Sequence, residues 1–535
     1  MVNNGTIINS DNTFVFAGTT QTLTGTAPVL FNNLDVESGS MTTIATAGQT
    51  LGGILLSNGI INAGGYMTHL STATRTALID GSGSGQVLGN ITMQRYLPSG
   101  FGYKYFSSAF QGATVNEFGD DMNLLASFPS LYEYDESRGS SGWISYTTPS
   151  DVLNPMHGYA VNFGSNVAAL TADVTGVVNN GNLSGTLYNN NNTYTKGFNL
   201  AGNPYPSPID WDAPSGWTKT NIDNSLYFFK ASLTDQYGGI YSTYISGLSS
   251  DGLASNIIPS MQGFFVHVSD GTWPVTGTLA LSNSVRMNDS AHPFAKSELS
   301  TSTPPYIRVV AGYSDDTLSF DPLCVYYDIK ATYNFDGQYD AYKLFNTDIT
   351  VTNYYSFGND GSRLSINALP FDGDSICKIR LGLKTDRSGD VIFRIKDIIG
   401  DFNANYISIT DLFTGVTQDL LFDEQYKVHL ASGDYQNRFF LNLSNIITVI
   451  PDMVTEIDWF NIYTSKGILI AEINIPPGEN GDLKIYSLTG QTLYIYENNQ
   501  AGYHEFSPVI KDGIYIVTFT TGNLRASKKL FIHSQ

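Results

Sequence analysis

The side chains best able to do acid–base or nucleophilic chemistry are spread thinly along this chain. Seven histidines occur singly, at His69, His157, His267, His292, His429, His504 and His533. The sequence has no Gly-x-Ser-x-Gly elbow, phosphate-binding glycine loop, His-Glu-x-x-His pair or EF-hand loop. Isolated histidines without such motifs are typical of strand and surface positions, so we expect no enzymatic activity.

Acidic residues occur in pairs, at 120–121, at 210 and 212, and at 315–316. A glycosidase needs two carboxylates facing each other across a cleft, which adjacency along the chain does not supply. Carboxylates in turn-rich loops are better suited to calcium, which prefers oxygen ligands. Calcium is therefore the one cofactor that the sequence allows, and its candidate ligands are Asp336, Asp340, Asp372 and Asp374.

Tryptophans offer a second kind of site. Trp211 and Trp217 flank a loop rich in proline, glycine and aspartate. Exposed indole rings could stack on sugar faces, whereas buried ones would belong to the core, which large aromatic side chains dominate energetically. The sequence leaves both interpretations open and makes these two residues the candidates for glycan contact.

Composition narrows the class of protein. The 535 residues carry a net charge of −21 with only 14% charged side chains, and 13% of the chain is aromatic. A polyanionic surface repels phosphate backbones, so we expect no nucleic-acid partner. No run of 18 apolar residues occurs, so we expect no transmembrane helix. Cys324 and Cys377 are the only cysteines, either as one disulfide or as two buried thiols.

β-Branched and aromatic residues, punctuated by Gly, Asn and Asp, predict an all-β chain. Within residues 1–90, short apolar segments recur with a period of about 20 residues, typical of a β-helix or related solenoid. A β-sandwich with glycine-rich hairpins is the alternative for this segment. Tandem β-sandwich domains are expected to follow it.

Residues 91–190 and 191–295 correspond to each other segment by segment. Leu131–Tyr134 matches Leu226–Phe229, and Pro155–Phe163 matches Ser260–Val268, in the same order. The sequence thus predicts two related β-domains, each near the usual length of a sandwich. A polar, Pro-ended linker at 297–305 precedes a third β-sandwich over 306–445, and a last one spans 450–535.

Three elements follow one another near the end of the chain. They are Ile485–Gln491, Asp512–Val517, and Lys528-Lys529 before an apolar strand. Their order resembles the type A C-terminal sorting domain of type IX secretion cargo in Bacteroidota. The resemblance implies an Ig-like sandwich whose sorting signal comprises Gly490, Gly513, Tyr515, Val517, Lys528 and Lys529. Two features differ from the family: Ser487 replaces an aspartate, and residues 462–467 replace the usual Tyr-Pro-Asn-Pro opening.

The resemblance also implies partners and a location. The partners would be the outer-membrane translocon of type IX secretion and its shuttle barrel, together with surface glycans or other surface proteins. The location would be extracellular or on the cell surface, associated with the outer membrane. Residues 1–5 lack the basic and apolar regions of a signal peptide, so we expect the export signal to lie upstream of this sequence.

Segments 202–211 and 259–266 resemble a module of large surface proteins from the same bacteria. Segments 340–344 and 364–370 resemble the β-domain that often precedes the sorting domain. We therefore expect a non-catalytic surface protein: an adhesin, a stalk, or a component of a surface or gliding apparatus. The alternative is the accessory carbohydrate-binding region of a secreted polysaccharide-degrading enzyme.

Overall fold

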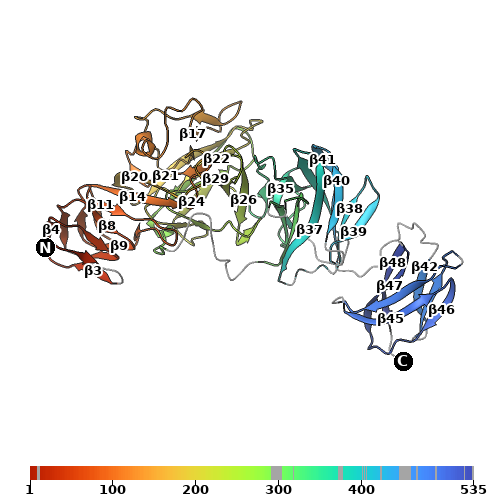
Figure 1. Cartoon of the computed structure of the whole chain (residues 1–535). Helices are drawn as coiled ribbons and strands as arrows, with labels where there is room; N and C mark the ends of the chain where they lie inside the picture. Colours follow the sequence, from red (N-terminus) through yellow and green to blue (C-terminus); the bar gives the residue numbers. More distant parts are fainter. Residues whose placement is uncertain are drawn as a thin grey trace. The chain divides into compact units, whose positions relative to one another are not determined.

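The computed structural model describes residues 1–8, 12–290, 304–316, 319–370, 377–400, 402, 404, 406–421, 425–444, 460–465, 468–476, 478–488, 491–522 and 524–532 (Figure 1). Within these residues, 48 strands are joined by turns, and the helical elements are two short 3-10 helices, η1 (Val115–Phe118) and η2 (Asn283–Val285). The predicted all-β class is confirmed. No helix in the described part of the chain is long and apolar enough to cross a membrane.

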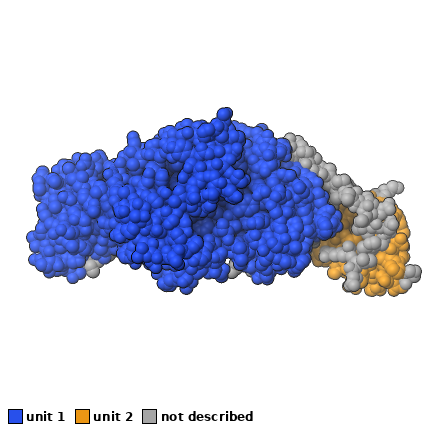
Figure 2. All heavy atoms as spheres, turned by 90° about the horizontal axis from the view of Figure 1, so that it is seen from above, with its two compact units in different colours: residues 1–446 blue, residues 447–535 orange. Residues whose placement is uncertain are grey.

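Contacts between residues divide the chain into two compact units, Met1–Ile446 and Ile447–Gln535, which Figure 2 colours blue and orange. The first unit contains the solenoid, the two repeats and the third β-domain. The second unit has a hydrophobic core of its own, built around residues such as Val517 and Phe519. Each unit therefore buries its own apolar surface.

Residues 2–97 coil into a parallel β-solenoid with three sheets (Figure 1). The first sheet contains β1 (Val2–Asn3), β4 (Thr20–Gly25), β7 (Met41–Ile44), β10 (Ile60–Asn62) and β13 (Gln86–Leu88). The second contains β2 (Ile7–Ile8), β5 (Val29–Phe31), β8 (Gln49–Leu51), β11 (Met67–His69) and β14 (Asn90–Leu97). The third contains β3 (Thr13–Phe16), β6 (Asn33–Val36), β9 (Ile54–Ser57) and β12 (Leu78–Ile79). The predicted solenoid is confirmed.

Alternation within these short strands builds the solenoid core. Leu34 and Val36 on β6 are buried, while Asp35 between them is only partly covered. Leu34 pairs in register with Leu55 of the next rung, so like side chains stack along the solenoid. A single rung cannot bury its inner face, and stacking supplies about 1.5–3 kcal/mol for each large aliphatic side chain that it covers.

The two repeats have inner sheets of the same topology. The first sheet runs in the order β15 (Tyr103–Phe106), β19 (Tyr159–Asn162), β17 (Leu131–Tyr134) and β18 (Trp143–Ser145). The second runs in the order β22 (Phe198–Gly202), β29 (Gly263–His267), β25 (Leu226–Ala231) and β26 (Gly239–Ile245), and adds a short fifth strand, β27 (Leu248–Ser249). Tyr132 lies opposite Ala160 in the first sheet, and Tyr227 lies opposite Phe265 in the second. Register and order therefore agree between the copies.

Each repeat adds an outer antiparallel pair of strands. These pairs are β14 with β20 (Leu170–Val178), and β21 (Leu183–Asn189) with β30 (Val275–Leu281). Because β14 also pairs with β11, the solenoid sheet continues directly into the first repeat. Because β21 pairs with β30, the second repeat begins at Leu183, earlier than the boundary at residue 191 predicted from the sequence.

The repeats meet at a seam with local two-fold symmetry. Phe106, at the end of β15, forms a bridge with Gln262, just before β29. The equivalent residues exchange roles on the other side, where Ala201 of β22 forms a bridge with His157, just before β19. Each copy thus gives the other the same two contacts, an isologous arrangement within one chain.

Residues 306–444 form one mixed sheet of eleven strands. In order they are β39 (Val416–Asp419), β38 (Tyr406–Asp411), β41 (Gly433–Ser444), β36 (Cys377–Thr385), β34 (Asn353–Phe357), β35 (Arg363–Leu369), β32 (Asp321–Tyr327), β31 (Tyr306–Tyr313), β37 (Gly389–Ile399) and β40 (Tyr426–Leu430), with β33 (Ala341–Tyr342) paired to β35. Strands distant in this order share one core, since the rings of Phe393 and Phe439 lie 4.9 Å apart. The sheet therefore folds over on itself, as a sandwich does.

The two cysteines are free thiols, so the disulfide left open by the sequence does not form. Cys324 faces the aromatic cluster shared with the repeats, whereas Cys377 belongs to the core of the third domain. Burial raises the pKa of the Cys324 thiol to about 12 and that of Cys377 to about 11. Both therefore remain protonated and act as small apolar side chains.

The second unit consists of two antiparallel sheets. One contains β42 (Phe460–Ser465), β43 (Ile468–Ile473) and β46 (Gly502–Phe506). The other runs in the order β45 (Thr492–Asn499), β44 (Gly481–Tyr486), β47 (Gly513–Thr521) and β48 (Leu524–Ile532). The rings of Phe460 and Phe519 stack across the two sheets with centroids 5.2 Å apart. This is the face-to-face packing of a β-sandwich.

Candidate functional site

The central strand of the second unit carries the apolar residues of the predicted sorting signal. β47 lies between β44 and β48, and Val517 on this strand is fully buried. Tyr515 packs partly against the same core, and its hydroxyl donates a hydrogen bond to the Lys511 carbonyl at 2.7 Å. Gly513 begins the strand. The Gly-x-Tyr-x-Val segment thus anchors its sheet to the core.

The basic pair Lys528–Lys529 lies on the edge strand β48, and both side chains are exposed. Neighbouring residues on a strand point to opposite faces. Lys528 leans toward the other sheet, where its ammonium donates to the Asn461 side chain at 3.3 Å. Two cations on an exposed edge are accessible to an acidic partner, and they also discourage unwanted strand pairing.

The turn before β45 forms its local bonds through serine. The Gln491 amide donates to the Ser487 hydroxyl at 3.1 Å, and the Ser487 amide donates to the Gln491 carbonyl at 2.9 Å. Serine therefore supplies here the kind of local side-chain bond that aspartate makes in turns. Gly490 lies outside the described residues.

The two tryptophans of the candidate site pack against each other. Trp211 is 1% exposed, and its indole N–H donates to the Asn224 carbonyl at 2.8 Å. Trp217 is half-buried against it, with ring centroids 5.0 Å apart, and donates to the Asp210 carbonyl at 2.7 Å. For Trp211 the structure supports the core interpretation of the two that the sequence left open, because its ring belongs to the core of the second repeat.

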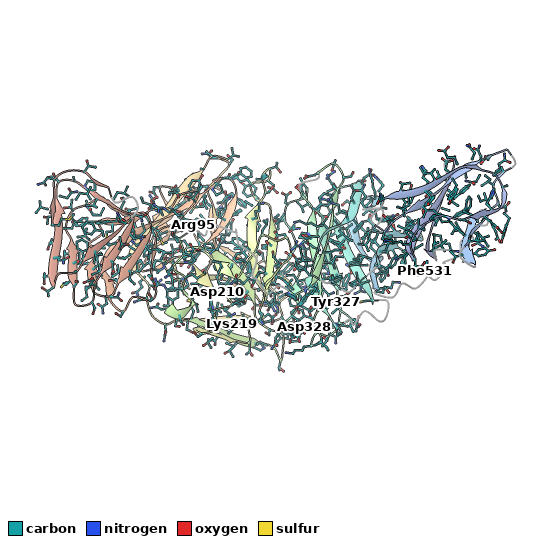
Figure 3. The ribbon with its side chains drawn as sticks, turned by 90° about the horizontal axis from the view of Figure 1, so that it is seen from below. Arg95, Asp210, Lys219, Tyr327, Asp328 and Phe531 are labelled. Atoms are coloured by element: carbon teal, nitrogen blue, oxygen red, sulfur yellow. The ribbon has the colours of Figure 1, made fainter. Side chains whose placement is uncertain are left out.

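A lysine completes this tryptophan cluster. The Lys219 ammonium lies 3.6 Å from the centroid of the Trp211 ring and donates to the Trp211 carbonyl at 2.8 Å. Burial lowers its pKa to about 8, although Asp212 and Asp210 oppose the shift. Lys219 and Asp210 lie close together in Figure 3. The amine is already committed to the loop that it holds, so its role here is structural.

In the acidic loop at 336–340, the Asp340 carboxylate is hydrogen-bonded to backbone amides. Asp340 is buried and accepts hydrogen bonds from the amides of Ala368 at 2.7 Å and Asp336 at 2.8 Å. Burial raises its pKa to about 7. Among the described residues, no group of three or more His, Cys, Asp or Glu side chains is placed to hold a metal. The carboxylate of Asp340 is used within the loop, and calcium at Asp336 and Asp340 stays a prediction. Asp372 and Asp374 lie outside the described residues.

One buried cluster contains the residue types of a catalytic triad without its geometry. Asp223 and His267 are joined by a 2.6 Å contact from Oδ2 to Nδ1, and the Ser269 hydroxyl donates to the other oxygen of Asp223. In a triad the second imidazole nitrogen must face the serine hydroxyl. Here Nε2 faces the Lys196 carbonyl at 2.9 Å instead, so this cluster ties loops together.

A further aromatic group, the seam cluster, comprises Tyr103, Phe128, Tyr132 and Tyr237. The four rings form a closed circuit: Phe128 lies 5.0 Å from Tyr237 and 6.4 Å from Tyr132, and Tyr103 lies 6.1 Å from Tyr132 and 6.4 Å from Tyr237. Phe128 and Tyr237 are each 54% exposed. Three rings come from the first repeat and one from the second, so the cluster spans the seam between them.

Polar groups border the seam cluster. The Tyr103 hydroxyl donates to the Pro129 carbonyl at 3.3 Å, and the Gln236 side-chain amide donates to Asn162 Oδ1 at 3.3 Å. Burial raises the pKa of both Tyr103 and Tyr132, so these phenols stay neutral near pH 7. The sequence comparison aligned Tyr132 with Tyr227 but passed over Phe128 and Tyr237, because both lie in loops outside the matching strands.

Comparison with known proteins adds one finding. The family described as Domain of unknown function (DUF8693) matches residues 4–443, which is most of the 535-residue chain. The match covers the solenoid, both repeats and the third β-domain. No curated protein matches the chain.

Proposed function

The chain belongs to this family of unknown function, and from its own residues we propose that it is a non-catalytic cell-surface protein exported by type IX secretion. The observation that supports export most directly is the self-contained sandwich of residues 460–532. Its central strand β47 carries Gly513, Tyr515 and Val517, and its edge strand β48 exposes Lys528 and Lys529. The matched family segment ends before this sandwich begins, which is consistent with a separate role for it.

A structural role for the first unit is supported by how its polar groups are used. Arg286 donates from Nε to the Ser207 hydroxyl at 2.9 Å and from Nη2 to the Ile79 carbonyl, which joins the second repeat to the solenoid. Arg308 of the third domain donates to the Ser249 carbonyl of the second repeat at 2.9 Å. Buried charged hydrogen bonds at both junctions resist bending, as a stalk or adhesin scaffold requires.

Deletion of residues 447–535 tests the export proposal. The full chain and residues 1–446 would be produced behind one export signal in a bacterium with a type IX system. Accessibility to external protease then reports surface display. We expect the full chain on the surface and the truncated chain inside the cell envelope. Equal display of the two chains would refute the proposal.

Point variants separate recognition from folding. Lys528→Ala with Lys529→Ala removes two exposed cations from the edge strand and should leave the core intact. We expect surface display to fall while the protein remains folded. Lys511→Ala is the matched control, since Lys511 is an exposed lysine of the same unit whose backbone carbonyl, not its side chain, contacts Tyr515.

A further inference from the structure

Two aromatic rings of the seam cluster, those of Phe128 and Tyr237, are more than half exposed to solvent. Two exposed leucines lie on the loops that carry Phe128 and Tyr237: Leu125 is 88% exposed and Leu233 is 82% exposed. Single apolar residues on a surface are ordinary, but a contiguous group that includes four rings is typical of a binding site. Tyr105 and Phe229 stack in the adjoining core with centroids 4.9 Å apart, and Tyr103 and Tyr132 pack partly against that core, whereas Phe128 and Tyr237 do not belong to it.

The second repeat shows what covers the equivalent surface when it is buried. Tyr103 and Tyr132 correspond to Phe198 and Tyr227 by strand register. Both of these residues are buried, and Tyr342 of the third domain lies 6.3 Å from Phe198, centroid to centroid. The same aromatic surface is therefore covered in one copy and partly exposed in the other.

The open copy differs from the covered copy in its polar groups. Tyr103 replaces Phe198, which adds a hydroxyl, and Asn162 replaces His267, which adds an amide beside Gln236. The covered surface combines apolar contact with polar contacts: His267 faces Asp223, and the Tyr342 hydroxyl of the third domain donates to Asp270. The open surface combines ring faces with neutral hydrogen-bond donors and acceptors.

Charge limits what can occupy this surface. The four rings of the seam cluster carry no formal charge, while the chain as a whole carries −21. Nucleic acids and anionic glycans would be repelled, and so would a second copy of the same polyanionic chain. An uncharged ligand with many hydroxyl groups and apolar ring faces is the occupant that both the chemistry and the charge favour.

We propose that the seam cluster is a binding platform for neutral polysaccharide. Phe128 and Tyr237 present their rings to the apolar faces of pyranose units. The hydroxyls of Tyr103 and Tyr132 and the partly exposed side chain of Gln236 exchange hydrogen bonds with the sugar hydroxyls, while the buried Asn162 holds Gln236 in place through its side-chain oxygen. The platform requires both repeats, because Tyr237 and Gln236 come from the second and the remaining groups from the first.

Affinity electrophoresis of the purified full chain tests this proposal. The gels would contain, one at a time, soluble β-glucan, α-glucan, mannan and xylan. We expect at least one of these polysaccharides to retard the protein. Phe128→Ala with Tyr237→Ala should weaken that binding by at least about 10-fold, equivalent to about 1.4 kcal/mol. Tyr194→Ala is the matched control, because Tyr194 is 71% exposed and lies outside the cluster.

Three outcomes would overturn the proposal. One is the absence of retardation of the unmodified chain by any of the four polysaccharides. Another is retardation that the double variant retains in full. The third is concentration-dependent dimerisation by light scattering that the double variant abolishes, with no polysaccharide binding, since the surface would then be a self-association site. None of these outcomes affects the export proposal, which concerns residues 447–535.

Discussion

The first and second repeats place the same inner sheet in two different surroundings. In the first repeat, over residues 90–178, the outer pair of strands continues the solenoid sheet, and the aromatic side of the inner sheet reaches solvent at Tyr103 and Tyr132. In the second repeat, over residues 183–281, the outer pair belongs to a small separate sheet, and Tyr306, Tyr326 and Ile366 of the third domain join the aromatic cluster. The same strand order thus serves as a junction on one side and as an open surface on the other.

The two repeats also differ at the residue three positions before the matching strands β17 and β25. Asp223 in the second repeat forms a buried pair with His267, whereas the residue at the same place in the first repeat is Phe128, exposed to solvent. His267 itself corresponds to Asn162. Two positions that form a buried hydrogen-bonded contact in the second repeat therefore carry an exposed ring, Phe128, and a buried amide, Asn162, in the first. The inner sheets of the two repeats share one strand order, while their side chains differ with the neighbouring domain.

Tyr227 and Tyr132 give the most direct measure of this difference, because they are the same residue type at the same sheet position. Tyr227 is 0% exposed, while Tyr132 is only partly buried. We expect Tyr227→Ala to lower the free energy of unfolding of the first unit by about 4 kcal/mol and Tyr132→Ala by about 1 kcal/mol. Calorimetric unfolding of the full chain measures both. Equal losses would mean that the third domain contributes little to burial at Tyr227.

The buried pair gives the next largest effect. Asp223→Ala leaves the buried His267 ring without its hydrogen-bond partner, and an unsatisfied buried polar group costs about 1–3 kcal/mol. At the equivalent position, Phe128→Ala should cost well under 1 kcal/mol, because the ring is half in solvent. Denaturant unfolding compares the two variants. A loss at Phe128 that matches the loss at Asp223 would contradict the assignment of Phe128 to a surface rather than a core.

The seam itself should respond in the same way in both copies. Gly158 and Gly263 occupy equivalent positions, where an added Cβ would lie 2.6 Å from the Ala201 carbonyl oxygen and 2.9 Å from that of Phe106. Both approaches are too close for a methyl group, so each Gly→Ala change should cost about 2 kcal/mol through overpacking. Thermal unfolding of the two single variants provides the comparison. If only one variant is destabilised, the local two-fold symmetry does not extend to the packing energy.

Sequence reasoning found the features that depend on local spacing. The rung period of the solenoid and the correspondence of Leu131–Tyr134 with Leu226–Phe229 are visible as repeated patterns, and the structure has both. Burial of a side chain by residues distant in the sequence leaves no such repeated pattern. Trp211 and Tyr237 are both aromatic residues near turns, yet the first is buried by its own repeat and the second is open, because tertiary contacts decide exposure. The seam cluster was missed for this reason.

The smallest expected difference between the two repeats is in how their stability depends on pH. Asp121, beside the outer strand β20, has its pKa raised to about 6, first by burial and then by the neighbouring charge of Asp120. Asp173 on β20 faces the same group, and its amide donates to the Asp121 carboxylate at 3.3 Å. The outer strand of the second repeat, β30, carries no acidic residue, so titration at this strand belongs to the first repeat.

The sign of the effect follows from the direction of the shift. Because the folded-state pKa of Asp121 lies above its ordinary value of 3.8, its contribution to stability is complete below about pH 4 and is lost as the pH rises through 6. Asp121 is partly exposed, so solvent screening limits the loss to under about 1 kcal/mol. Asp121→Asn should reduce the fall in unfolding free energy between pH 4 and pH 7, and Asp120→Asn should reduce it only in part. If both variants keep the profile of the unmodified chain, the pH dependence arises elsewhere, and the acidic surface of the first repeat does not distinguish it from the second.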